Sequence, residues 1–219
     1  MTPTTYATPP AFRQALEARL NGLARKRGVD VQRLRRQVAF DRFLCRLFQH
    51  SGERWLLKGG YAMELRMRES RTTRDIDLTT RGPIRGSGRF ADRILRLLQA
   101  AASLELGDFF VFAVGESTQD LAGAPYGGAR FPVDARLAGR VFARFHVDVG
   151  TGDPIVEPVE TVRGEDWLGF AGIHTRRVGT EKSCHFSSLS RLFMSEWVRM
   201  RGASVAWAEI RSQADRLRG

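Results

Sequence analysis

Two aspartates separated by one residue, Asp75 and Asp77, are the first candidates for chemistry in this chain. They lie in a β-rich segment, where a two-residue period places both carboxylates on one face while Ile76 points into the core. Their Cα atoms are then roughly 7 Å apart. Both can reach one hard-cation site, where two magnesium ions about 4 Å apart would hold the attacking and leaving oxygens of a phosphoryl transfer. A solvated Asp-x-Asp at a strand end is the alternative interpretation.

The segment before these aspartates predicts a seat for an anion. Residues 55–58 are expected to form a buried strand that leads into Gly59-Gly60, and residues 61–67 are expected to form a helix. Glycines let backbone N–H groups approach phosphate oxygens, and a helix N-terminus favours negative charge. Lys58 would add a point charge, unless it only ends the strand. We therefore expect a triphosphate seat beside a metal seat.

A third carboxylate comes from the segment Phe-His-Val-Asp-Val at residues 145–149. Alternation places His146 and Asp148 on the face opposite the two valines. Asp148 is expected to join the metal site from a neighbouring strand and to help draw the proton from an attacking hydroxyl. A strand-end aspartate in an ordinary turn is the alternative. We expect His146 at the surface or behind the ligands.

An α+β fold, with a mixed sheet flanked by N- and C-terminal helices, is expected to position these groups. Five β-rich segments predict strands of one sheet, at residues 55–60, 74–80, 109–116, 129–137 and 141–150. The last two are expected to form an antiparallel hairpin through Ala138-Gly139. A helix over residues 89–104, with Ser87 as its N-cap, is predicted between the second and third strands.

Apolar side chains at helical spacing predict helices on both sides of the sheet segments. One helix is expected to end at Gly28, and a second carries an apolar stripe from Leu34 to Phe48. We expect the stripe to be core and the arginines around it to be at the surface, namely Arg33, Arg35, Arg36, Arg42 and Arg46. Two short helices are predicted after Ser187. Residues 115–130 are predicted to be the loosest stretch.

The charge is unevenly distributed along the 219 residues, whose 35 basic and 24 acidic side chains give a formal +11. We divide the chain into a basic helical region (1–50), a core that contains the predicted sheet and the candidate site (51–173) and a second basic helical region (174–219). The flanks have net charges of +7 and +5, and the core has a net charge of −1. Clustered cations attract phosphate, so we expect a polyanion at the flanks. Solvated arginine-rich helix faces are the alternative.

Composition excludes several classes of protein. The 42% hydrophobic content excludes intrinsic disorder, and the apolar runs are shorter than the roughly 20 residues that a bilayer requires. Cys45 and Cys184 are far apart, so no zinc cage is expected. Because the first residues lack the regions of an export signal and free thiols suit a reducing compartment, we expect a soluble, cytoplasmic protein that does not bind membranes.

The run WLLKGGYAMELRM, followed by RTTRDIDL and later by FHVDVGTGDP, resembles the AbiEii/AbiGii toxin family of nucleotidyltransferases, which includes the mycobacterial MenT toxins. The similarity covers about residues 7–173 in order and spacing. The family belongs to the DNA polymerase beta-like nucleotidyltransferase superfamily. The resemblance implies nucleotide binding by Gly59 and Gly60 and magnesium binding by three carboxylates, those of Asp75, Asp77 and Asp148. It places Lys58, Thr73 and Arg74 near the phosphates.

The resemblance also implies an acceptor and a partner. Some members add nucleotides to the 3′ end of transfer RNA, which blocks aminoacylation, and act as toxins paired with an AbiEi-like antitoxin bearing a winged-helix domain. Family members continue with a helix that contains Glu-Lys, followed some twenty residues later by an aspartate. Glu181-Lys182 corresponds to the first part, which makes Lys182 a catalytic candidate. The stretch SCHFSSLSRLFMSEW departs from the family, and Asp215 lacks the expected context.

Three functions remain open at this point. The first is a magnesium-dependent toxin in which the 3′-hydroxyl of transfer RNA attacks the α-phosphate of an NTP and pyrophosphate leaves. The second transfers the nucleotide to a protein side chain instead. The third is an inactive nucleotidyltransferase fold that binds RNA or a partner, which the unmatched tail favours. No Walker A loop or G-x-S-x-G elbow supports a hydrolase.

Overall fold

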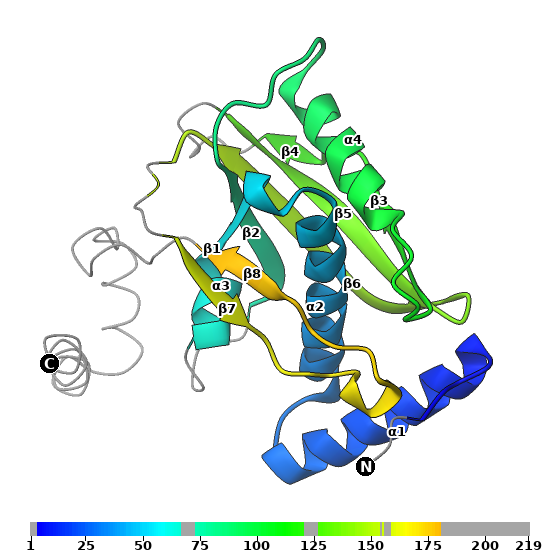
Figure 1. Ribbon diagram of the computed structural model, residues 1–219. Coiled ribbons are helices and arrows are strands. Elements are labelled where there is room, and N and C mark those ends of the chain that lie inside the picture. The colour runs from blue at the N-terminus through cyan, green and yellow to red at the C-terminus, as the bar shows by residue number, and fades with distance from the viewer. Residues whose placement is uncertain (1–3, 67–72, 121–126, 154, 156–158, 181–219) are drawn as a thin grey trace, which may run out of the picture. The chain divides into compact units, whose positions relative to one another are not determined.

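The computed structural model describes residues 4–66, 73–120, 127–153, 155 and 159–180 (Figure 1). They belong to one structural unit, residues 1–182. The described helices are α1 Pro9–Arg27, α2 Val31–Ser51, α3 Gly59–Arg66 and α4 Phe90–Ala102. The described strands are β1 Trp55–Lys58, β2 Asp75–Thr80, β3 Phe110–Val114, β4 Gln119–Asp120, β5 Gly128–Leu137, β6 Arg140–Thr151, β7 Glu160–Arg163 and β8 Arg177–Thr180. Lys182 and the two helices predicted after Ser187 lie outside the described residues.

These strands form one mixed sheet of eight strands. Its order is β3-β5-β6-β2-β1-β8-β7, and β4 adds to β5. The pairs β2–β6 and β1–β8 are parallel, whereas the other pairs are antiparallel. The predicted α+β class, with a mixed sheet flanked by helices, is confirmed, as are the five predicted strands. The prediction missed β4, β7 and β8, because segments of two to four residues are too short to show an alternating pattern.

One face of the sheet is covered by α2 and α4 (Figure 1). Phe40 and Phe43 of α2 contact Phe145 of β6, with ring centroids 4.9 and 5.8 Å apart. Phe40 also contacts Tyr61 of α3 in an edge-on pair. This aromatic cluster holds α2 and α3 against the sheet. Because side chains alternate along a strand, the neighbours of Phe145 in β6 point to the face away from α2.

Local signals explain where the first helices begin and end. The Thr8 hydroxyl caps α1 by accepting a hydrogen bond from the Ala11 N–H group (3.4 Å). Gly28 ends α1 as predicted, in the left-handed conformation at φ 65°. The Asp30 carboxylate then caps α2. The third helix begins at Gly59, two residues before the predicted start.

One local prediction was wrong. Ser87 does not cap α4, because Gly88 at φ 88° still turns the chain, and Arg89 precedes the helix without a side-chain cap. The stretch 115–130, predicted to be the loosest, contains β4 and the first three residues of β5. Its residues 121–126 lie outside the description. Within the stretch, Gln119 pairs with Arg130 and Asp120 pairs with Ala129.

The expectation that all arginines around the α2 stripe lie at the surface was wrong for Arg42 and Arg46. Both are buried, and both donate to the buried carboxylate of Asp108, which precedes β3. Arg46 reaches Oδ1 of Asp108 at 2.6 Å, and Arg42 reaches Oδ2 at 2.8 Å. A buried charge is tolerated when it is paired and hydrogen-bonded. The partner is more than sixty residues away in the sequence, so the helical pattern could not reveal it.

The buried carboxyl of Asp41, beside Arg42, predicts a pH-dependent stability. Burial raises its pKa to about 6, although Arg42 opposes the shift. A raised pKa means that the contribution of this group is fully present below about pH 4 and lost as the pH rises through about 6. Between pH 4 and pH 7 the free energy of unfolding of Asp41→Asn should therefore rise relative to wild type by about 2 kcal/mol.

Urea unfolding of both proteins at several pH values measures this difference, since other titrating groups cancel between them. Asp92→Asn is a control of opposite sign, because a hydrogen bond from Arg89 lowers the pKa of that exposed carboxyl. Parallel pH profiles for wild type and Asp41→Asn would contradict the prediction.

Candidate active site

Four charged side chains form a row across four neighbouring strands. The antiparallel pair β1–β2 places Lys58 opposite Asp77, and the parallel pair β2–β6 places Asp77 beside Asp148. The antiparallel pair β5–β6 then places Asp148 opposite Arg130. Asp75 lies two residues along β2, beside His146 of β6. Strand register thus brings Asp75 and Asp77 together with Asp148, which is more than seventy residues away in the chain.

This row lies on the face of the sheet away from α2. Ile76 and Val147, which alternate with the charged residues, are fully buried in the core. Asp75, Asp77 and Asp148 are only partly buried. The predicted alternation of β2 and β6 is therefore observed, and the carboxylates are at the border between core and solvent.

A tight glycine turn joins β1 to α3 directly against Asp77. Gly59 has φ +64°, and a Cβ atom at this position would lie only 2.1 Å from Asp77 Oδ2. The Gly60 N–H group donates a hydrogen bond to the Asp77 carboxylate. A Cβ atom on Gly60 would lie 3.1 Å from both Cβ and Oγ1 of Thr73. In this structure the anion at the N-terminus of α3 is consequently the side chain of Asp77.

Arg130 is the side chain that the sequence analysis did not single out. It donates two hydrogen bonds to Asp148, from Nε to Oδ1 at 2.7 Å and from a terminal nitrogen to Oδ2 at 2.6 Å. The same terminal nitrogen lies 3.7 Å from Asp75 Oδ2. The other oxygen of Asp75 is 3.2 Å from His146 Nδ1. Arg130 therefore bridges Asp148 and Asp75, two of the three candidate metal ligands. His146 contacts the oxygen of Asp75 that does not face Arg130.

A β-bulge decides which residue of β6 lies opposite Arg130. The predicted hairpin turns at Ala138 and Gly139, both at positive φ, and pairs Leu137 with Arg140. An uninterrupted ladder from that pair would place Arg130 opposite Val147. The register shifts by one residue between Arg136 and Ala135, so that Arg130 lies opposite Asp148 instead. The extra residue is on β6 and keeps the apolar side chains of that strand on the core face, because a one-residue slip would reverse every side chain.

Lys58 has a second acidic neighbour beyond the row. Its Nζ atom donates to Asp153 Oδ2 at 2.5 Å, and both side chains are partly buried. Although burial alone would raise the pKa of Asp153, the hydrogen bond from Lys58 holds it below the ordinary value. Asp153 belongs to the GTGDP segment at the end of β6, and no local pattern indicated that it would meet Lys58.

Comparison with known families bears on this arrangement. A family model described as Nucleotidyl transferase AbiEii toxin, Type IV TA system, matches residues 42–175, which is more than half of the chain. The chain belongs to the AbiEii family. No curated protein matches it. Membership implies nucleotidyltransferase activity, a nucleotide substrate and an antitoxin partner.

The matched segment of this AbiEii chain contains the row on the sheet and the glycine turn. Lys58, Gly59, Asp75, Asp77 and Asp148 lie together there. Thr73 lies against Gly60 and donates from its hydroxyl to the Asp75 carbonyl (3.1 Å), whereas Arg74 is exposed. The candidate Lys182 falls outside both the matched segment and the described residues. Arg130 and Asp153, which the prediction missed, belong to the same neighbourhood.

Asp77 is the most perturbed carboxyl of the site. Its burial raises the pKa to about 6, and the negative charges of Asp148 and Asp75 add to this effect. Lys58 and the Gly60 N–H group oppose it. Like charges gathered in a partly buried place raise the cost of ionisation. The site is therefore short of positive charge, even with Lys58 and Arg130 present.

Nucleotidyltransferases of this kind generally use a divalent metal. Carboxylate oxygens are the donors that magnesium prefers, and register brings three of them onto one face. Among the residues that the structure describes, no three such side chains are close enough to hold an ion as they stand. Both oxygens of Asp148 are bonded to Arg130. The donors fit magnesium in kind and share one face of the sheet, and metal binding would require Arg130 to release Asp148 and the three carboxylates to move closer together.

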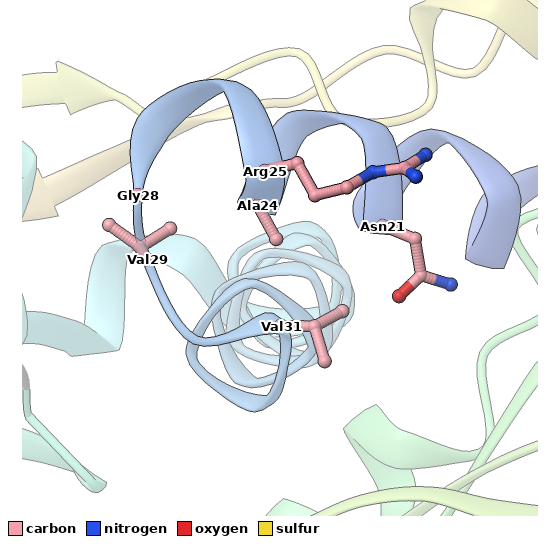
Figure 2. A pocket seen from close by; sticks show the side chains of 6 residues that line it. All are labelled: Asn21, Ala24, Arg25, Gly28, Val29 and Val31. Atoms are coloured by element: carbon pink, nitrogen blue, oxygen red, sulfur yellow. The ribbon is translucent and has the colours of Figure 1, made fainter.

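A hollow on the described surface lies apart from the row of charged side chains. It has a volume of about 650 Å³ and is formed where α1 turns into α2 (Figure 2). Its lining residues are Asn21, Ala24, Arg25, Gly28, Val29 and Val31, none of which is a candidate site residue.

Within the described part of the chain, no helix has the length and apolar character needed to cross a bilayer.

Proposed function

We propose that this AbiEii toxin transfers nucleotides from an NTP to the 3′ end of transfer RNA, with magnesium, and so inhibits translation. The observation that supports it best is the pairing of Asp77 with Asp148 on adjacent parallel strands, directly beside the Gly59 turn. Two metal-seeking carboxylates and a helix N-terminus at one point are what an NTP with its magnesium requires.

In this proposal Asp75, Asp77 and Asp148 would hold the magnesium, which supplies positive charge against the charge that develops on the phosphates. The backbone at Gly59 and Gly60 binds the triphosphate. The RNA 3′-hydroxyl oxygen then bonds to the α-phosphorus as the bond to the bridging oxygen breaks, and pyrophosphate leaves. The hydroxyl proton passes to a carboxylate oxygen of Asp148. Positioning and charge neutralisation account for the rate enhancement.

Thr73, Arg74 and Lys182 complete the proposed site. Thr73 would stabilise the turn at Gly60 by packing against it, and the exposed Arg74 would contact the phosphates from the solvent side. Lys182 remains a proposed catalytic residue on the strength of the family resemblance. The antitoxin partner is proposed to be AbiEi-like.

The acceptor is proposed to meet the basic flanks, yet part of that charge is used inside the fold. Six of the ten basic side chains in residues 1–50 form ion pairs with carboxylates. They are Arg13, Arg27, Arg33, Arg35, Arg42 and Arg46. The pairs of the exposed Arg27 and of the half-buried Arg13, Arg33 and Arg35 reach solvent, and such pairs are weak and open to competition from phosphate. The buried pairs of Arg42 and Arg46 are not available to RNA.

The test is incubation of the protein with each labelled NTP, magnesium and total transfer RNA. Label in RNA that depends on Asp77 is expected. Label that migrates with a protein would move the acceptor to a protein side chain, as in the second function considered above.

An inactive fold that binds RNA is a second candidate. Arg130 is hydrogen-bonded to Asp148, and the Asp77 carboxylate accepts a hydrogen bond from the N-terminus of α3, where a triphosphate would bind. This candidate predicts no label in any acceptor and no Asp77-dependent NTP binding by calorimetry. RNA binding that survives loss of all three carboxylates and weakens steeply with salt would support it.

Lys58→Met is expected to raise the KM for NTP about tenfold with a smaller change in kcat, since a charge-assisted hydrogen bond contributes about 1.5–3 kcal/mol. The physical reason is the loss of a point charge beside the triphosphate seat. Lys58→Arg, which keeps the charge, should recover most of the affinity. Initial rates over a range of NTP concentrations measure both constants. An unchanged KM in Lys58→Met would show that Lys58 serves only its pair with Asp153.

A further inference from the structure

The two-pronged contact between Arg130 and Asp148 occupies the atoms that a metal ion would need. Each Asp148 oxygen accepts one hydrogen bond from Arg130, at 2.7 and 2.6 Å. The guanidinium extends to within 3.7 Å of Asp75. Because the same guanidinium nitrogen lies near both carboxylates, a cation that binds Asp148 and Asp75 together would compete with Arg130 for Asp148.

The contact joins two paired strands of the sheet and is partly shielded from water. Arg130 and Asp148 are directly opposite in the β5–β6 ladder, a register that depends on the bulge at Ala135. Only 13% of the Asp148 side chain and 32% of the Arg130 side chain are exposed. Planar, two-pronged pairs of this kind are stronger than single charged hydrogen bonds, and partial burial reduces screening by salt.

The excess of negative charge at the site explains why Arg130 pairs with Asp148. Three carboxylates lie within electrostatic reach of one another, and Arg130 and Lys58 are the cations beside them among the residues that the structure describes. Lys58 is already paired with Asp153. Arg130 is thus the cation that offsets the repulsion among the carboxylates when no metal is bound. A divalent ion would offset the same repulsion more fully. Arg130 and the ion would therefore compete for Asp148.

We propose that Arg130 is a resident counter-cation, which holds the carboxylates together without metal and exchanges with the divalent ion at Asp148. Arg130 thereby sets the metal affinity of the site and makes it weaker than the carboxylates alone would give. This inference rests on the proposed function, because it takes the three carboxylates to be the metal ligands. It assigns Arg130 the role of a positioning residue.

Titration of the full chain with Mn²⁺, followed by the electron paramagnetic resonance signal of free Mn²⁺, tests the exchange without any measurement of activity. Arg130→Gln is expected to bind Mn²⁺ at least about tenfold more tightly than wild type, since a charged two-pronged contact no longer competes. Its midpoint of thermal unfolding without metal should fall and should recover when Mn²⁺ is added. Arg144→Gln is the matched control, because Arg144 contacts Asp134 at 3.2 Å from an exposed position on β6. This control should keep the wild-type dissociation constant.

Arg130→Lys provides a second variant if the glutamine variant does not fold. It keeps the charge but loses the two-pronged geometry, so its Mn²⁺ affinity should lie between the other two. Unchanged or weaker Mn²⁺ binding in the Arg130 variants, with Asp77-dependent binding in wild type, would overturn the exchange and leave the proposed function intact. Absence of Asp77-dependent Mn²⁺ binding in every variant would overturn both.

Discussion

Asp77→Asn is expected to lower nucleotide transfer at least about a thousandfold, because a lost metal ligand removes several kcal/mol of charge stabilisation. The chain should remain folded. Asparagine has nearly the shape of aspartate and its amide oxygen can still accept from the Gly60 N–H group. Burial and neighbouring negative charges raise the pKa of Asp77, so its ionised form disfavours the metal-free fold. We therefore expect an unfolding midpoint at pH 7.5 equal to or above that of wild type.

Incorporation of labelled NTP and thermal unfolding followed by circular dichroism measure the two effects separately. The control is Asp134→Asn, on the same strand as Arg130, whose carboxylate pairs with the exposed Arg144. It should alter neither quantity. Activity within tenfold of wild type in Asp77→Asn would remove Asp77 from the proposed site, whereas an unfolded variant would show that Asp77 is needed for the fold.

Gly59→Ala is expected to be nearly as damaging, through geometry rather than charge. The added Cβ atom would lie 2.1 Å from Asp77 Oδ2 and 2.9 Å from Asp77 Cβ, so the carboxylate must leave its place. The residue also has φ +64°, where an L-residue costs about 1–2 kcal/mol. We expect a loss of activity of at least about a hundredfold, since small displacements of reacting groups have effects of that size.

The chain provides a control for the backbone cost. Gly28 has φ +65°, yet a Cβ atom there would meet nothing within 4 Å. Gly28→Ala should lose about the same 1–2 kcal/mol of unfolding free energy from its φ but keep full activity. Urea unfolding together with NTP incorporation distinguishes the two variants. Equal behaviour of Gly59→Ala and Gly28→Ala would mean that the contact with Asp77 has no role in the reaction.

These two predictions address one feature, the close approach of β1, α3 and β2 at Asp77. Gly59 permits that approach, and Asp77 then lies between the N-terminus of α3 and Asp148. The metal-free site is held by internal contacts, from Arg130 to Asp148 and from Gly60 to Asp77. Binding of substrate with its metal would have to replace both contacts. A metal-binding measurement on Arg130→Gln and an activity measurement on Asp77→Asn therefore examine the two halves of the same exchange.

Much of the site followed from local patterns. The two-residue period of strands placed Asp75 and Asp77 on one face and Ile76 in the core, as the burial of β2 confirms. The same period placed Asp148 on the face opposite Val147. The Gly-Gly pair indicated a turn into a helix, and Gly28 indicated a helix end. These features depend on residues within a few positions of one another, and backbone stereochemistry determines such relations in any tertiary context.

The tertiary structure alone decided which distant residues meet. That Asp148 lies beside Asp77, and that Arg130 rather than Ala129 lies opposite Asp148, depends on strand order and on one bulge near Ala135. Asp108 likewise turned two expected surface arginines of α2 into core residues. Alternation tells which face a side chain takes but carries no information about which strand pairs with which, or in what register. That choice is made by the burial of the whole apolar face, a sum over residues far apart in the chain.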